Sequence, residues 1–194
     1  KEIANKNGLA CFSSPFDPTS VDFLENINMP AYKVASSEVC DLPLLRKIAK
    51  TNKPIILSTG MATSSEINSA LATVKNEGND KIILLKCTCS YPAPPSDMNL
   101  KTMVHMSNSF GVPAGLSDHT LGHDVALASV ALGACMVEKH LTLCRNDGGI
   151  DDYFSMEPNE FKDMVDCIRI IESAIGNISY GPTKSENIGV KNRR

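Results

Sequence analysis

The chain alternates short apolar runs of strand length with longer stretches that carry a helical pattern. Consecutive runs begin between 22 and 31 residues apart, which leaves room for one crossover helix each time. The runs contain few alternating polar positions, as is typical of parallel strands that are covered on both faces. This spacing predicts a series of six βα units, whose expected strands are residues 9–13, 32–36, 54–58, 81–87, 112–116 and 135–139.

The expected helices carry start signals of their own. Thr63 and Glu66 form a capping-box pattern at the start of one predicted helix. Asp41 is placed to cap the helix that follows the second expected strand. Pro158 occupies the tolerated first turn of the longest helix, which we expect to end near Gly176. The helical pattern between the apolar runs is therefore supported by capping residues.

Polar residues follow every expected strand end, and this placement decides between two α/β architectures. A doubly wound open sheet usually centres its ligand site on one switch point. A site built from residues at every strand end is instead typical of a (β/α)8 TIM barrel. We therefore expect an incomplete TIM barrel fragment with about six βα units, corresponding to strands 3–8. Residues 1–180 would form this barrel without its first two strands, and residues 181–194 would begin a linker.

Composition excludes several classes of protein. The formal net charge of −3 offers no basic surface suited to nucleic acid. No apolar run approaches the roughly 20 residues of a membrane span, and no signal peptide opens the chain. The seven cysteines are an odd number and lie mostly in apolar runs, so we expect reduced thiols and a cytoplasmic protein. Cys87 and Cys89 are expected on opposite faces of a strand, and on this expectation they would not share a metal.

Two histidines each follow the end of an expected strand. His119 and His140 are 21 residues apart, with a helix-like stretch between them. In a parallel α/β sheet this spacing aims both imidazoles at one edge, where a divalent metal or a substrate would lie. The alternative is a pair of histidines that only support neighbouring groups. We assign no role to His105 and His123, which lie in or at the start of expected helices.

Hydroxyl groups are expected to ring the same end of the barrel. Such a ring suits a phosphate, particularly beside a lysine. Lys33 lies inside an expected strand, where it must either face a polar lumen or be buried without a partner. An outward-pointing lysine on an edge strand is the alternative. The hydroxyl residues are Ser13, Ser14, Ser36, Ser58 and Ser117.

Three further residues are candidates for contacts at this edge. Glu38 is a carboxylate two residues beyond Ser36, or else a helix N-terminal acid stabilised by the helix dipole. Tyr91 opens a rigid proline-rich loop and could cover the site, although a plain surface turn is equally compatible with the sequence. Asp151 lies in a long, glycine-hinged loop after the last expected strand, well placed to touch a substrate.

Six motifs, taken together and in order, make the chain resemble the sialic acid synthase family. The resemblance implies condensation of phosphoenolpyruvate with an N-acetylated hexosamine, giving a nonulosonic acid and phosphate. It also implies a (β/α)8 barrel that carries a divalent metal, followed by a small antifreeze-like domain. The motifs are Phe12-Ser-Ser-Pro-Phe-Asp17, Tyr32-Lys-Val-Ala-Ser36, Leu57-Ser-Thr-Gly-Met-Ala62, Tyr91-Pro-Ala-Pro-Pro95, Gly115-Leu-Ser-Asp-His-Thr-Leu-Gly122 and Glu138-Lys-His140.

The resemblance implies a role for each matching position. His119 and His140 match the two ligands of a Mn²⁺ or Mg²⁺ ion, and with Glu38 they form the expected catalytic set. Tyr91 and Asp151, together with Glu38, match sugar-side positions. Cys89 departs from the family, whose members carry a small polar residue such as Asn or Ser there. The positions that match phosphoenolpyruvate contacts are Lys33, Ser36, Ser58 and Ser117, with Ser14 at a neighbouring hydroxyl position.

The resemblance also implies catalytic residues and a domain that lie outside these 194 residues. The family's catalytic glutamate lies on the first strand and a further phosphate-binding lysine on the second. The antifreeze-like domain supplies an arginine to the sugar site across a dimer, so we expect the parent protein to be a homodimer. On this reasoning the isolated chain should be inactive. An alternative of another class is a phosphate-binding barrel without catalysis.

The loop over residues 147–158 bears on the sugar substrate. Its Gly-Gly-X-Asp…Phe-Ser-X-Glu-Pro form resembles pseudaminic acid synthases, whereas N-acetylneuraminate and legionaminate synthases more typically show Pro-Gly-Pro-Asp-His. We therefore expect a 2,4-diacetamido-2,4,6-trideoxyhexose as the acceptor and pseudaminic acid as the product. N-acetylneuraminate or legionaminate synthesis remains the alternative.

Overall fold

A computed structural model describes residues 1–190, 192 and 193. Its centre is one parallel sheet of five strands in the order β1-β2-β3-β4-β5, so each strand pairs with the next one along the chain. This unreversed order is that of a barrel wall, because a doubly wound sheet reverses direction at a switch point. The strands are β1 Tyr32–Val34, β2 Ile55–Ser58, β3 Ile82–Cys87, β4 Ala114–Asp118 and β5 Val137–Lys139.

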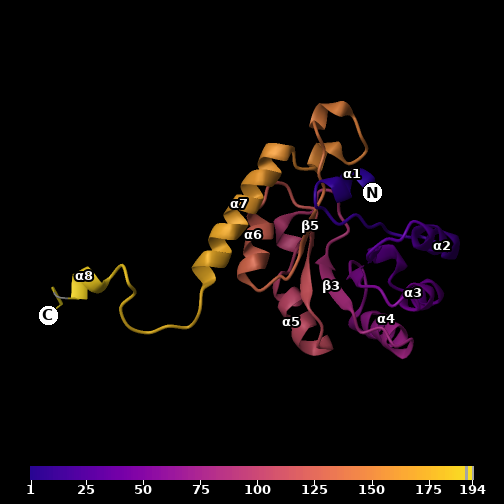
Figure 1. The fold of residues 1–194 in the computed structure, drawn as a ribbon, viewed down its shortest axis with the longest axis horizontal. Helices are drawn as coiled ribbons and strands as arrows, with labels where there is room; N and C mark the ends of the chain where they lie inside the picture. The colour runs from indigo at the N-terminus through magenta and orange to yellow at the C-terminus, as the bar shows by residue number, and fades with distance from the viewer. Residues whose placement is uncertain (191, 194) are drawn as a thin grey trace.

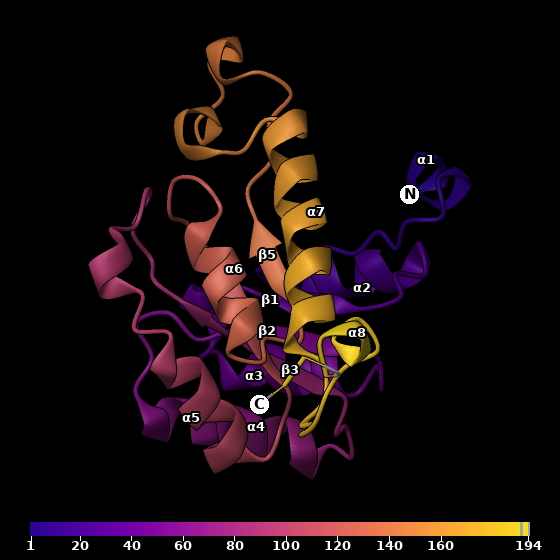
Figure 2. The ribbon, with the colours of Figure 1, turned by 90° about the vertical axis from the view of Figure 1, so that its left-hand side faces the viewer.

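Helices alternate with the strands and lie around the sheet, which curves as a half-barrel (Figures 1 and 2). The last long helix packs against the helix before β5 (Figure 2). The longer helices are α2 Pro18–Asn26, α3 Leu42–Ala49, α4 Ser64–Asn76, α5 Lys101–Phe110, α6 Asp124–Ala131 and α7 Pro158–Ile175. Shorter turns of helix are α1 Glu2–Lys6, η1 Ser36–Glu38, η2 Pro95–Asp97, η3 Arg145–Asp147, η4 Asp152–Phe154 and α8 Asn187–Val190.

The first expected strand is almost absent. Over residues 9–13 the chain makes a single parallel bridge, between Ser13 and Tyr32, in which the N–H of Lys33 donates to the carbonyl oxygen of Ser13 at 3.1 Å. Leu9 in this segment is 63% exposed. The segment therefore has apolar strand character without the ladder of hydrogen bonds that defines a strand, and five of the six expected strands are present.

Local signals position the other elements as predicted. The hydroxyl of Thr63 accepts from the N–H of Glu66 at 3.3 Å, and the Glu66 carboxylate accepts from the N–H of Thr63 at 2.7 Å. The Asp41 carboxylate accepts from the N–H of Leu44 at 3.0 Å. β4 begins two residues later than expected, directly after Pro113, which has no N–H to donate. The capping predictions are confirmed.

The core lies between the outer face of the sheet and the helices. Buried side chains of β1, β2 and β3 pack against those of α3 and α4. Every residue of β1, β2 and β4 is buried, whereas the three residues of β5 are half-buried. Gly115 in β4 marks a close approach of two backbones, because an added Cβ would lie 2.3 Å from the carbonyl oxygen of Met136. A glycine is therefore required where β4 meets the segment that leads into β5.

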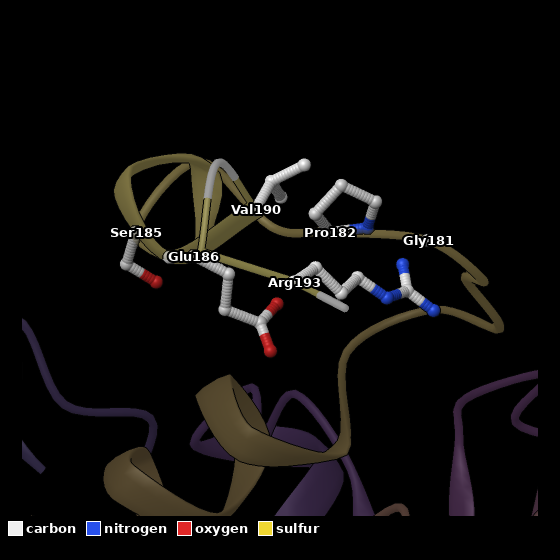
Figure 3. Close-up of a pocket in the computed structure, with 7 residues that line it drawn as sticks. Gly181, Pro182, Ser185, Glu186, Val190 and Arg193 are labelled. Atoms are coloured by element: carbon white, nitrogen blue, oxygen red, sulfur yellow. The ribbon is translucent and has the colours of Figure 1, made fainter.

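The C-terminal segment beyond α7 extends away from the half-barrel (Figure 1). It surrounds a cavity of about 580 Å³ lined by Gly181, Pro182, Ser185, Glu186, Gly189, Val190 and Arg193 (Figure 3). Every lining residue comes from this one exposed segment and none from a strand end. The predicted linker over 181–194 includes positions 191 and 194, which lie outside the described residues. Among the described helices, none combines the length and hydropathy needed to cross a membrane.

Candidate functional site

The carboxyl ends of the strands meet at a cavity of about 360 Å³. Because parallel strands all end at the same edge, the residues that follow them converge there. Eight of the eleven residues expected at this edge from the sequence line this cavity. The complete lining is Ser14, Lys33, Ala35, Ser36, Ser37, Ser58, Met61, Cys87, Cys89, Tyr91, Ser117, His119, Glu138 and His140.

Lys33 points into the cavity and is held there by neighbours on other strands. Its Nζ donates to the hydroxyl of Ser58 at 2.8 Å and lies 3.6 Å from Oε1 of Glu138. The residue is only 9% exposed. Lys33 therefore does not point outward. Its buried ammonium group faces the cavity, where it could pair with an anionic ligand.

Glu138 is a site residue to which the sequence reasoning gave no role. Its Oε1 accepts from the hydroxyl of Ser117 at 2.6 Å and faces Lys33. The sequence does hold a signal for Glu138, because side chains alternate along a strand with a period of two. This period places Glu138 on the same face as His140, which directly follows β5, and Lys139 on the opposite face. Glu138 thus connects Ser117 of β4 with Lys33 of β1.

The two histidines stand together, with ring centroids 5.2 Å apart and planes at 70°. His119 places Nδ1 2.9 Å from the carbonyl oxygen of Thr88, and His140 places Nδ1 3.4 Å from a carboxylate oxygen of Asp151. Burial and the neighbouring His119 lower the pKa of His140, while Asp151 and Glu138 act in the opposite direction. A neutral imidazole whose Nδ1–H is engaged in this way presents Nε2 as a free acceptor.

Aromatic rings enclose the histidines at the mouth of the cavity. The Tyr91 ring lies 4.3 Å from the His119 ring, and the Phe154 ring lies 4.8 Å from the His140 ring, measured between centroids. The Tyr153 hydroxyl donates to the carbonyl oxygen of Tyr91, joining the two loops. Tyr91 is 47% exposed, so it forms the rim of the site as well as a wall.

A buried ion pair joins the residues that precede the two histidines. Lys139 donates to Oδ2 of Asp118 at 2.8 Å, with side chains 2% and 0% exposed. Asp118 also accepts from the N–H and hydroxyl of Thr120, at 2.9 and 2.8 Å. Each member of the pair precedes one of the histidines in sequence, so the pair fixes the two strand ends relative to each other. Sequence reasoning did not identify it.

The placement predicted for Cys87 and Cys89 is wrong. Their sulfur atoms lie 4.0 Å apart and both line the cavity. The expectation misjudged the strand period, because residues two apart on a strand lie on the same face. Cys87 is the last residue of β3, and the chain turns at Thr88, whose carbonyl oxygen accepts from the N–H of Ser90 at 2.9 Å. Both cysteines nevertheless line the same cavity.

Ser13, Glu38 and Asp151 are the expected residues outside the lining of the cavity. Glu38 lies in η1 and accepts from the hydroxyl of Ser37 at 2.8 Å. Asp151 lies in the loop after β5 and places a carboxylate oxygen 3.4 Å from Nδ1 of His140. The sugar-side roles of Glu38 and Asp151 stay predictions.

Among the described residues, no group of three or more His, Cys, Asp and Glu side chains could hold a metal ion. The donor set that the sequence predicted is smaller, namely the imidazoles of His119 and His140. Both are carried by the ends of rigid strands, and each has its Nδ1 engaged by an oxygen. Two neutral imidazoles are a donor set compatible with a divalent metal. The assignment of His119 and His140 as metal ligands stays a prediction.

Comparison with known proteins finds close relatives. The N,N'-diacetyllegionaminic acid synthase of Campylobacter jejuni is 46% identical over 185 residues, which cover 94% of this chain and 55% of the relative. The pseudaminic acid synthase of Helicobacter pylori is 45% identical over 175 residues, which cover 90% of this chain and 52% of the relative. The chain thus spans about half the length of these curated relatives.

A solved structure agrees with these sequence relatives. N-acetylneuraminic acid (sialic acid) synthetase from Leptospira borgpetersenii, in complex with citrate, matches with a TM-score of 0.92 at 34% identity, covering 100% of this chain and 67% of that one. The resemblance to sialic acid synthases that the motifs predicted is confirmed. Residues 1–180 match the model of the NeuB family, and this stretch contains every residue that lines the strand-end cavity. The chain therefore belongs to the NeuB family.

Proposed function

We propose that the full-length protein containing this chain condenses phosphoenolpyruvate with an N-acetylated hexosamine, releasing phosphate and forming a nonulosonic acid. The observation that carries the proposal is the inward-facing Lys33, ringed by hydroxyl groups and set opposite two histidines in one cavity. Relatives named for legionaminic acid and pseudaminic acid synthesis support it. On this proposal the half-barrel is part of a complete (β/α)8 barrel.

The lysine end of the cavity would bind phosphoenolpyruvate. The ammonium group of Lys33 supplies positive charge in a buried setting, where it interacts with an anion more strongly than it would in water. Ser36, Ser58 and Ser117, with Ser14 at the edge, add hydroxyl donors. Glu138 orients Lys33 and Ser117 before substrate arrives.

The histidine end would receive the sugar. We propose that His119 and His140 hold a Mn²⁺ or Mg²⁺ ion, which when bound supplies Lewis-acid polarisation of the open-chain sugar's carbonyl group. Burial and the neighbouring His119 lower the pKa of His140, which favours the neutral imidazole that metal binding requires. Tyr91 shields this end from water, and Glu38 and Asp151 would contact the sugar.

The reaction would take place where the two bound substrates are adjacent in the cavity. The enol carbon of phosphoenolpyruvate attacks the carbonyl carbon of the sugar, forming a carbon–carbon bond. Water captures the resulting oxocarbenium-like centre, and the tetrahedral intermediate loses phosphate. Holding both reactants in one cavity contributes to the rate by removing the entropy cost of their encounter.

Pseudaminic acid is the product that the loop over residues 147–158 favours, with a 2,4-diacetamido-2,4,6-trideoxyhexose as acceptor. Legionaminic acid is the second candidate, because the relative so named shares 46% identity. We further propose a cytoplasmic homodimer. The seven cysteines, all free, support a reducing compartment.

The test is condensation by the purified full-length protein. Phosphate release from phosphoenolpyruvate should require Mn²⁺ or Mg²⁺ and a 2,4-diacetamido-2,4,6-trideoxyhexose, and should fall sharply when the sugar has only one acetamido group. Lys33→Met should abolish it, whereas Lys162→Met, on the exposed face of α7, should not. Binding of phosphoenolpyruvate without turnover would favour the non-catalytic alternative instead.

A further inference from the structure

Cys87 and Cys89 form a close pair of thiols in the wall of the candidate site. Their sulfur atoms lie 4.0 Å apart, both line the cavity, and both are free. Cys87 ends β3, whereas Cys89 belongs to the loop that follows and is less constrained by the sheet. Neither thiol has a part in the proposed condensation.

The residue between the two cysteines holds one of the histidines. The carbonyl oxygen of Thr88 lies 2.9 Å from Nδ1 of His119, and the sulfur of Cys87 lies 4.0 Å from the same nitrogen. A change in the backbone between Cys87 and Cys89 therefore acts directly on the orientation of the His119 ring.

Cys89 also packs tightly against the hydroxyl ring. An added Cβ at Gly60 would lie 2.4 Å from the Cys89 sulfur and 2.9 Å from the hydroxyl of Ser36. That same hydroxyl accepts from the N–H of Gly60 at 3.0 Å. Displacement of the Cys89 sulfur would therefore change the shape of the cavity beside Ser36, as well as the support of His119.

We propose that Cys87 and Cys89 are a redox modification site, at which a peroxide joins the two sulfurs in a disulfide and switches the site off. Disulfide sulfurs are about 2.05 Å apart, so from their present separation they must approach by about 2 Å. Rotation of the Cys89 side chain with adjustment of the loop supplies that movement. The inference rests on the proposed function only for its activity readout.

The chemistry balances with hydrogen peroxide as the oxidant. One thiolate attacks a peroxide oxygen, which breaks the O–O bond and leaves a sulfenic acid and water. The second thiol attacks the sulfenic sulfur, forms the S–S bond and releases a second water. Two electrons pass from the sulfurs to the peroxide, and a dithiol reductant reverses the step.

The experiment treats the full-length protein with hydrogen peroxide and follows two readouts. The first is the mass of the tryptic peptide over residues 87–101, which contains both cysteines and no other. The second is phosphate release from phosphoenolpyruvate. We expect this peptide to lose the mass of two hydrogen atoms while the rate falls at least tenfold, and dithiothreitol to restore both.

Two variants complete the test. Cys89→Ser should keep its own starting rate after peroxide, whereas Cys135→Ser, which removes an exposed cysteine outside the cavity, should stay as sensitive as the unchanged protein. A peptide that gains oxygen without forming the disulfide, or a disulfide that leaves the rate unchanged, would overturn the proposal. If the reduced protein shows no condensation at all, the proposed function fails, and the peptide mass still decides whether the disulfide forms.

Discussion

At the scale of single residues, the two histidines carry the most specific chemistry. Both imidazoles are held at Nδ1 by an oxygen and enclosed by aromatic rings, an arrangement that orients each ring rather than packing it into the core. Sequence reasoning could place them because a strand end is a local feature. It could not assign Glu138, because that role depends on Ser117 and Lys33 arriving from other strands.

Replacing either histidine should abolish metal-dependent condensation without unfolding the full-length protein. We expect His119→Ala and His140→Ala each to lower kcat/KM at least about 100-fold, since losing about 2.7 kcal/mol of transition-state stabilisation has that effect. Initial rates across a Mn²⁺ titration, with circular dichroism as the check on folding, measure this. His105→Ala, on the exposed face of α5, is the matched control. Undiminished activity in either site variant would remove the ligand assignment.

At the scale of elements, the ends of β4 and β5 are joined by the buried pair of Asp118 and Lys139. Caps and strand positions could be predicted from the sequence because each depends on a few neighbouring residues, as at Thr63 and Glu66. The pairing of residues 9–13 and this ion pair could not, because each depends on contacts between distant segments.

Breaking the buried pair should be strongly destabilising. Lys139→Met leaves the Asp118 carboxylate buried without its cation, which we expect to cost about 3–5 kcal/mol in the free energy of unfolding. Lys162→Met breaks only the exposed pair with Asp166 and should cost less than about 1 kcal/mol. Urea unfolding of the full-length protein gives both values, and equal costs would contradict a structural role for the buried pair.

The close contact between Gly115 of β4 and the segment before β5 leads to a second prediction about the elements. Gly115→Ala forces a methyl group against the carbonyl oxygen of Met136, so we expect a loss of about 1–3 kcal/mol. Gly189→Ala places its methyl group in open space and should change stability by less than about 0.5 kcal/mol. Thermal unfolding of both variants compares them. A Gly115→Ala protein as stable as the unchanged one would mean that the two backbones can separate freely.

At the scale of the whole molecule, the described half-barrel has two open sides. β1 is extended only by the bridge at Ser13, and β5 pairs on one side with β4. Unpaired strand edges invite pairing with other chains. The 194-residue polypeptide expressed alone should therefore associate with rising concentration, as sedimentation velocity would detect. A monodisperse monomer that condenses phosphoenolpyruvate with the sugar would contradict this prediction.

The most direct measurement follows the fate of phosphoenolpyruvate labelled with carbon-13 at its methylene carbon. With the full-length protein, Mn²⁺ and a 2,4-diacetamido-2,4,6-trideoxyhexose, nuclear magnetic resonance should show the label as a methylene group bonded to the former carbonyl carbon of the sugar. Phosphate should appear in equal amount. Label that appears in pyruvate, or that remains in bound phosphoenolpyruvate, would contradict the proposal that this cavity joins the two substrates.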